Sequence, residues 1–184
     1  MRLEPVEKPG GLMLKIAYWA SRRQLGKVMT PMKVVYARMP RILKLSWNIV
    51  QFEDKAIRLD PGLKILVKTL AAQVNGCAFC VDIAKALAVQ KHMSLDKFQA
   101  LGEYRTSPLF SDRERAALAY VEEATRNKRV ADATFEILRK HFQEWEIVEI
   151  TWLNAIENYY NLINLPLGIE SDGLCAIAQK RAAA

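Results

Sequence analysis

The stretch Asn75–Ala88 reads NGCAFCVDIAKALA, and it decides how the helices on its two sides meet. Residues 61–74 before it repeat apolar residues at helical spacing, and Asn75-Gly76 is the kind of pair that ends a helix, because glycine readily adopts the left-handed conformation found there. A new helix is predicted from about residue 77 to 91. The two cysteines, Cys77 and Cys80, therefore fall in the first turn of a helix that follows a sharp break.

Helical spacing of apolar residues continues outward in both directions, and no stretch alternates apolar and polar residues long enough to predict a strand. Prolines at the start of segments and a Ser-x-x-Glu capping pattern at Ser111 mark several helix starts. The predicted helices cover residues 12–25, 40–52, 61–74, 77–91, a short segment after residue 94, 111–126, 132–142 and 144–164. We therefore expect an all-α fold with seven or eight helices in one domain.

The charge is spread unevenly along the chain. Residues 1–74 hold 14 Lys and Arg against 5 Asp and Glu, whereas the remainder holds 13 against 15, which gives the net charge of +7. The basic residues are scattered among apolar ones and accompany no nucleic-acid-binding motif, so we predict a solvated surface and no nucleic-acid partner. No apolar run approaches the roughly 20 residues that span a bilayer, so we expect no membrane association.

The compartment is predicted from the cysteines and from the N-terminus. Three cysteines are too few for a disulfide scaffold in a chain of 184 residues, and an odd number with one close pair fits a reducing compartment. The first residues, MRLEPVEKPGG, do not resemble a signal peptide. We therefore expect a cytoplasmic protein.

A C-x-x-C pair at a helix start can carry redox chemistry. Cysteines three residues apart on a helix are close enough for a disulfide. The unpaired N–H groups and the positive end of the helix dipole favour a thiolate, which is the nucleophile in disulfide exchange and peroxide reduction. Asp82 and Phe79 act in the opposite direction, since a nearby anion and an apolar environment both disfavour the thiolate.

Two other interpretations of Cys77 and Cys80 remain open. Free cysteines are often small, buried, apolar residues with no chemistry. A zinc site would need two further ligands from His92, His141 and Cys175, and none of these belongs to a second closely spaced pair. We therefore expect no metal, and the sequence indicates no cofactor.

Several segments together resemble one family. NGCAFCVDIAKALA, MSLDKFQAL, SPLFSDRERAALAYVEEATRN, DATFEILRKHFQEWEIVEI and ENYYNLINLPLGI are similar, in this order, to the carboxymuconolactone decarboxylase superfamily. The alkyl hydroperoxidase D-like (AhpD-like) branch is the most similar. The resemblance divides the chain into an N-terminal arm and helix (1–25), an AhpD-like domain (26–173) and a C-terminal tail (174–184).

The resemblance also implies an assembly and an activity. Members of the family are all-helical homo-oligomers, commonly trimers or hexamers, and those with an intact site are thiol peroxidases. By this match Cys80 is the peroxide-attacking thiol and Cys77 its resolving partner.

The chain departs from the family pattern at the positions of the proton relay. Ala84 stands where a histidine is expected, Ile65 where a glutamate is expected, and Phe79 where some members have a second histidine. General acid–base help is typically worth about 100- to 10,000-fold in rate, so weak activity is expected. The ENYYN segment adds Glu157 as a fourth pocket candidate; the interpretation we favour for it is a capped or paired surface charge.

Three functional hypotheses follow. The first is a thiol-dependent oxidoreductase that reduces a peroxide or exchanges a disulfide, with a thiol reductant protein as partner. The second is a non-catalytic ligand-binding or assembly protein that binds an apolar small molecule. The third is lactone decarboxylation, which does not require redox cysteines and ranks last.

Overall fold

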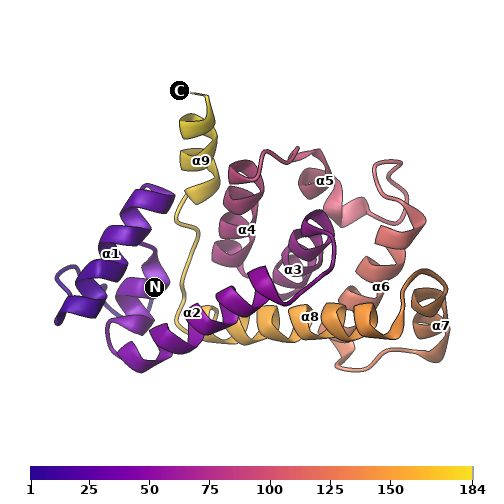
Figure 1. Cartoon of the computed structure of the whole chain (residues 1–184), viewed down its shortest axis with the longest axis horizontal. Coiled ribbons are helices and arrows are strands. Elements are labelled where there is room, and N and C mark those ends of the chain that lie inside the picture. Colours follow the sequence, from indigo (N-terminus) through magenta and orange to yellow (C-terminus); the bar gives the residue numbers. More distant parts are fainter. Residues whose placement is uncertain (184) are drawn as a thin grey trace.

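The structure is a computed structural model that describes residues 1–183, and these residues form helices and no strands. Figure 1 shows an elongated arrangement, with α1 at one end, α6 and α7 at the other, and α8 running along the molecule between them. The α-helices are α1 (Leu12–Leu25), α2 (Pro40–Lys55), α3 (Pro61–Asn75), α4 (Ala78–Gln90), α5 (Asp96–Gln99), α6 (Asp112–Asn127), α7 (Asp132–His141), α8 (Glu144–Asn164) and α9 (Leu174–Ala182). The all-α prediction is confirmed.

The predicted helix starts and stops are present. Asp60 caps α3 by accepting a hydrogen bond from the Leu63 N–H at 3.0 Å. Ser111 and Glu114 form the capping box of α6. Gly76 adopts φ +73°, the left-handed conformation that ends α3 and turns the chain into α4.

Helix α3 lies at the centre of the packing. It contacts α4, α6 and α8, and its apolar face is buried through Leu63, Leu66, Val67 and Leu70. Val67 belongs to a core cluster shared with α6 and α8, while Leu66 belongs to a second cluster shared with α5 and α6. Burying such side chains is the main stabilising term of the fold, at about 1.5–3 kcal/mol for each fully buried large aliphatic residue.

Two elements were not predicted. The segment expected to be a C-terminal tail contains α9, which packs along α4 through the buried Leu174 and Ala178. Met32–Tyr36 forms a short π-helical turn, η1, ahead of α2. Both elements are short, so the sequence contains too few repeats of the apolar period to indicate them.

Helices α1 and α2 keep apolar side chains on the surface. In α1 the apolar side chains of Leu12, Ile16 and Trp19 are exposed, because α1 packs inward through its other face. In α2 the only buried residue is Ser46, and Trp47 is 62% exposed. Within residues 1–183, no helix combines the length and the apolar character needed to cross a membrane.

Candidate redox site

Cys77 and Cys80 are joined by a disulfide, with their Cα atoms 5.3 Å apart. Cys77 is the N-cap residue of α4 and Cys80 is the third residue of the helix. The turn at Gly76 brings the Cys77 N–H to the carbonyl of Ala72, at 2.9 Å, and this contact fixes the first sulfur at the mouth of α4. The first N–H groups of a helix have no partner within it, so both sulfurs lie at the positive end of the α4 dipole.

The disulfide is enclosed by apolar side chains. Cys77 is 1% exposed and Cys80 is 4% exposed. They belong to a core cluster to which the end of α1, η1 and the segment 167–178 contribute, through Leu25, Val34, Ile169 and Leu174. An outside thiol or peroxide can therefore reach the sulfurs only when this cover moves.

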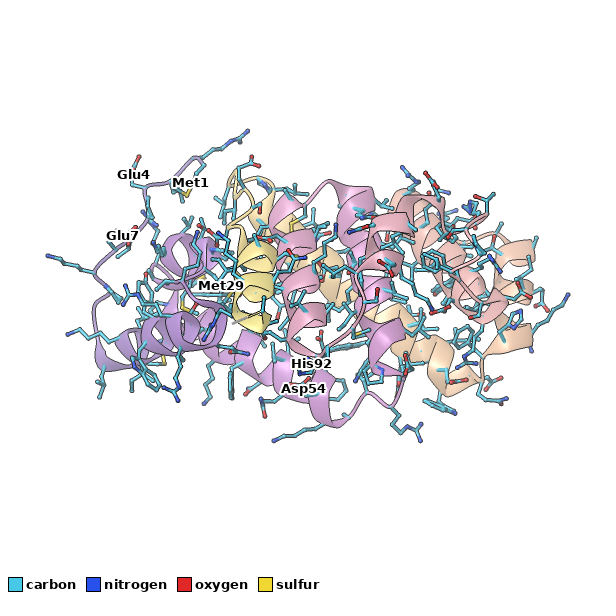
Figure 2. All side chains as sticks on the ribbon, turned by 90° about the horizontal axis from the view of Figure 1, so that it is seen from above. Met1, Glu4, Glu7, Met29, Asp54 and His92 are labelled. Atoms are coloured by element: carbon cyan, nitrogen blue, oxygen red, sulfur yellow. A yellow bond between two sulfur atoms is a disulfide. The ribbon has the colours of Figure 1, made fainter. Side chains whose placement is uncertain are left out.

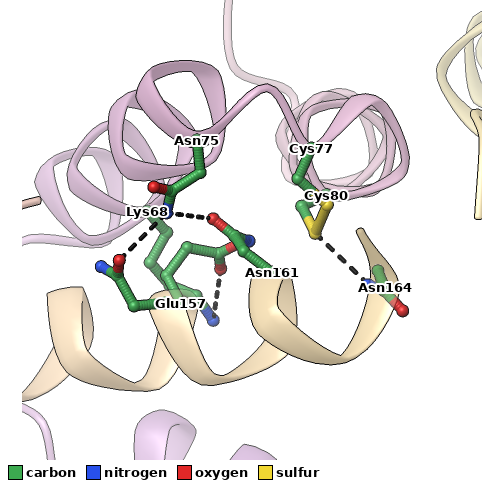
Figure 3. The surroundings of a disulfide bond; sticks show 8 residues. Lys68, Asn75, Cys77, Cys80, Glu157, Asn161 and Asn164 are labelled. Atoms are coloured by element: carbon green, nitrogen blue, oxygen red, sulfur yellow. Dashed lines mark hydrogen bonds and ion pairs between the residues drawn. A yellow bond between two sulfur atoms is a disulfide. The ribbon is translucent and has the colours of Figure 1, made fainter. Parts of the chain in front are cut away.

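One face of α8 is buried and polar. Asn154, Glu157, Asn161 and Asn164 follow one another at spacings of three, four and three residues, and all four are buried. Figure 3 shows this face turned toward the end of α3 and the start of α4. The Asn164 amide donates a hydrogen bond to Cys80 Sγ at 3.4 Å.

Asn75 connects this face to the C-x-x-C segment. Its side-chain amide donates to Asn161 Oδ1 at 2.8 Å and to Asn158 Oδ1 at 3.0 Å. Asn75 is the last residue of α3 and lies two residues before Cys77. The turn that carries the first sulfur is therefore bound to α8 through side chains.

Glu157 is 6% exposed, so the predicted surface position is wrong, whereas the predicted pairing is present as an ion pair with Lys68. Its carboxylate accepts a hydrogen bond from Asn161 Nδ2 at 2.8 Å. Lys68 Nζ lies 3.9 Å away and also binds Glu53 at 2.8 Å. Burial raises the pKa of Glu157, the Lys68 ammonium and the Asn161 amide lower it, and Glu53 raises it further; the net direction is upward.

The three relay positions hold no polar side chain. Phe79 is buried in the same apolar cluster as the disulfide. Ala84 lies one turn beyond Cys80 on α4 and is half-buried. Ile65 packs in the separate cluster near α5 and α6, so the structure does not bring all four pocket candidates together around the sulfurs.

The two histidines lie outside the site. His92, which is labelled in Figure 2, is exposed just beyond the end of α4. The cysteines lie at the other end of this helix. His141 is the last residue of α7. His141 lines a surface hollow of about 380 Å³ together with residues that include Tyr104 and Arg105. None of the residues that line this hollow belongs to the cluster around the disulfide.

The cover over the disulfide is tied to α4 by a buried carboxylate. Asp82, two residues after Cys80, accepts hydrogen bonds from Ser171 Oγ, from the N–H groups of Asp172 and Leu174, and from the Cys175 N–H, at 2.8–3.1 Å. Its charge is thus held by the start of α9. Burial and this carboxylate raise the pKa of the Cys175 thiol.

A second carboxylate extends the connection to the N-terminal segment. Asp172 accepts hydrogen bonds from the Thr30 N–H at 2.7 Å and from Thr30 Oγ1 at 2.8 Å. It also forms an ion pair with Lys27 at 3.1 Å. We call Asp82, Asp172, Thr30 and Lys27 the clasp, because together they join α4, the start of α9 and the segment after α1.

Sequence reasoning missed Asn164, Asn161, Asn75 and Lys68. Polar residues at alternating spacings of three and four along a helix with apolar neighbours were the available signal for the α8 face. Lys68 offered no signal, since a lysine in an amphipathic helix usually faces water.

Comparison with known proteins identifies the family. Residues 39–123 match the carboxymuconolactone decarboxylase family. The uncharacterised protein YnjA of Escherichia coli is 37% identical over 183 residues, which is 98% of this chain and all of YnjA. The chain belongs to the carboxymuconolactone decarboxylase superfamily, in its AhpD-like branch.

Solved structures share the fold. A protein of unknown function from Agrobacterium tumefaciens, described as a candidate antioxidant-defence protein AhpD, superposes with a TM-score of 0.69 at 29% identity, over 75% of this chain and 96% of that one. A cysteine-to-alanine variant of the debrominase Bmp8, in complex with 2,3,4-tribromopyrrole, superposes with a TM-score of 0.81 at 17% identity, over 99% of this chain and 97% of that one. At that identity the second likeness concerns the fold alone.

Proposed function

We propose that the protein is a thiol-dependent oxidoreductase that cycles Cys77 and Cys80 between the dithiol and the disulfide. The observation that carries the proposal is the disulfide at the first turn of α4, where the helix end favours a thiolate. A disulfide between two of only three cysteines also speaks against the interpretation of this pair as inert core residues or zinc ligands.

The reaction with a peroxide is balanced without a cofactor. The Cys80 thiolate attacks the terminal oxygen of the hydroperoxide, the O–O bond breaks, and the alkoxide leaves and takes a proton from water. The Cys77 thiolate then attacks the resulting sulfenic acid, an S–S bond forms, and the departing hydroxide is protonated to water. One dithiol and one hydroperoxide thus give one disulfide, one alcohol and one water.

An outside thiol returns the pair to the reduced form by disulfide exchange, and a protein thiol in the cytoplasm is the reductant that we propose. Exchange with such a partner is also an alternative use of the pair in place of peroxide reduction. The apolar residues at the relay positions support a slow reaction, since protons must then come from water or from groups other than histidine.

The test is to mix the reduced protein with an organic hydroperoxide and follow both peroxide loss and the mass of the peptide that spans Cys77 and Cys80. We expect one peroxide consumed for each disulfide formed, and we expect Cys80→Ser to abolish the reaction. Cys175→Ser is the matched control and should react as the wild type does. Unchanged turnover in Cys80→Ser would rule out the proposed chemistry.

The runner-up is a non-catalytic protein that binds an apolar ligand with the same fold. The apolar side chains at Ile65, Phe79 and Ala84 favour it. It predicts saturable binding of an apolar small molecule and no peroxide loss beyond that of buffer, so the same experiment separates the two functions.

A further inference from the structure

We infer that Asn164 is a catalytic residue of the redox pair, because its side-chain amide is the hydrogen-bond donor that stabilises the Cys80 thiolate in place of the missing histidine. The inference rests on the proposed function, and it assigns a role to a residue that lies 84 positions from Cys80 in the sequence. Its basis is the contact between Asn164 Nδ2 and Cys80 Sγ at 3.4 Å (Figure 3).

The surroundings of the sulfurs make this contact unusual. Within residues 1–183, Asn164 is the residue whose side chain donates a hydrogen bond to Cys80 Sγ, and the cluster around the disulfide is otherwise apolar. Asn164 itself is only 4% exposed. Burying an amide among apolar side chains costs free energy unless the amide forms a hydrogen bond, and the acceptor for the Asn164 amide is the sulfur of Cys80.

The backbone holds Asn164 in place. It is the last residue of α8, and its carbonyl accepts a hydrogen bond from the Ile169 N–H at 3.1 Å. One turn earlier on the same face, Asn161 is bound by Asn75 at the end of α3. The donor and the sulfur are therefore positioned from both sides of the contact, by α8 and by the turn into α4.

The contact gains strength when the sulfur becomes charged. A disulfide sulfur is a weak acceptor, whereas hydrogen bonds to ionised groups are roughly twice as strong as neutral ones. When an incoming thiolate attacks Cys77 Sγ, the S–S bond breaks and the electron pair leaves on Cys80 Sγ, next to the Asn164 N–H. In the reaction with peroxide the same N–H holds Cys80 as the thiolate that attacks oxygen.

The test measures the thiolate itself. In a Cys77→Ser, Cys175→Ser background Cys80 is the single thiol, and its ionisation is followed by the ultraviolet absorbance of the thiolate, which requires no access for a reagent. Asn164→Leu should raise the midpoint of this titration by about one pH unit, which is about tenfold less thiolate on the acid side of the midpoint. Asn164→Asp keeps the size of the side chain, adds a negative charge and should raise the midpoint further.

Asn154→Leu is the matched control. Asn154 is also buried on α8, but it binds Thr125 at 2.8 Å and lies ten residues before Asn164, or about 15 Å along the helix. It should lower stability and leave the midpoint unchanged.

The titration and the turnover assay give separable outcomes. An unchanged midpoint in Asn164→Leu would overturn the role of Asn164 even where the wild type consumes peroxide. A raised midpoint supports that role, and a wild type that then consumes no peroxide overturns the proposed function alone.

Discussion

At the scale of single residues, the site combines an ordinary C-x-x-C pair with unusual neighbours. Sulfur chemistry in this fold family normally has imidazole and carboxylate groups to move protons, as the resemblance implies. Here the polar groups near the pair are amides of α8 and α3, with Glu157 and Lys68 beyond them. Amides can donate hydrogen bonds to a charged group, but they do not readily give up or take up protons. We therefore expect this site to stabilise a thiolate more effectively than it transfers protons.

Glu157 leads to a prediction about pH. Burial raises the pKa of Glu157 in the folded protein, so ionising this carboxyl costs more free energy in the folded state than in the unfolded chain. The folded protein is therefore destabilised where Glu157 is ionised. The unfolding free energy of Glu157→Gln minus that of the wild type should therefore increase as pH rises from 4.5, the ordinary pKa, and level off above the raised pKa. Urea unfolding at a series of pH values measures this difference.

The control for this prediction is Glu136→Gln, because Glu136 is an exposed carboxylate that pairs with Arg139 on α7. Its difference from the wild type should vary little with pH. A difference for Glu157→Gln that falls with rising pH would mean that the Lys68 attraction exceeds the burial cost and that the pKa is lowered.

At the scale of elements, we expect the clasp to control access to the disulfide. It joins α4, which carries the disulfide, to the start of α9 and the segment after α1, which adjoin the residues of the cover. Hydrogen bonds to charged groups are worth about 1.5–3 kcal/mol each, so the clasp is strong enough to keep a short segment closed most of the time. We therefore expect the cover to open before an outside reagent reacts with the sulfurs.

Removing one carboxylate should make the disulfide easier to reach. In Asp172→Ala the carboxylate contacts to Thr30 and Lys27 are lost, while Lys27 keeps its hydrogen bond to the backbone carbonyl of residue 172. We expect the rate of disulfide reduction by a small dithiol to rise about tenfold, since about 1.4 kcal/mol of closing free energy corresponds to that factor. The rate is measured by trapping and mass spectrometry, without denaturant, so that global unfolding contributes little.

The exposed Asp112, which forms an ion pair with Arg115 on the same helix, provides the comparison. Asp112→Ala should reduce at the wild-type rate. Equal rates for Asp172→Ala and the wild type would show that the clasp does not control access.

The elements also show how far sequence reasoning reaches. Helices with several apolar repeats and clear caps, such as α3 and α6, were predicted almost residue by residue, and so was the position of the cysteines at a helix start. Helix α9 and the burial of Glu157 were not. Both depend on contacts between segments that are distant in the sequence, with Asp82 and with Lys68, and local periodicity contains no information about such contacts.

At the scale of the whole molecule, an apolar surface remains uncovered on α1 and α2. Trp19 is 61% exposed, and Leu45, Val50 and Phe52 of α2 are exposed with Trp47. Soluble monomers rarely leave a large contiguous apolar patch in water. We propose that a second copy of the chain covers this face, as the resemblance to oligomeric family members implies.

The proposal predicts a mass larger than that of one chain in light scattering. Trp19→Glu combined with Trp47→Glu should shift the mass toward 20.9 kDa, the mass of one chain, because charges on both helices oppose burial. Ile137→Glu on α7, at the opposite end of the molecule, should leave the mass unchanged. A wild-type protein that is already monomeric at micromolar concentration would contradict the proposal.

The disulfide closes a small ring, and the size of this ring determines how much the bond contributes to the stability of the fold. The bridge spans a separation of three residues, so in the chain-entropy description it restrains the unfolded polypeptide by only about 2 kcal/mol. The larger part of the stability resides in the helix contacts around α3, which do not involve sulfur. We therefore expect the architecture that surrounds the bond to persist when the bond is reduced.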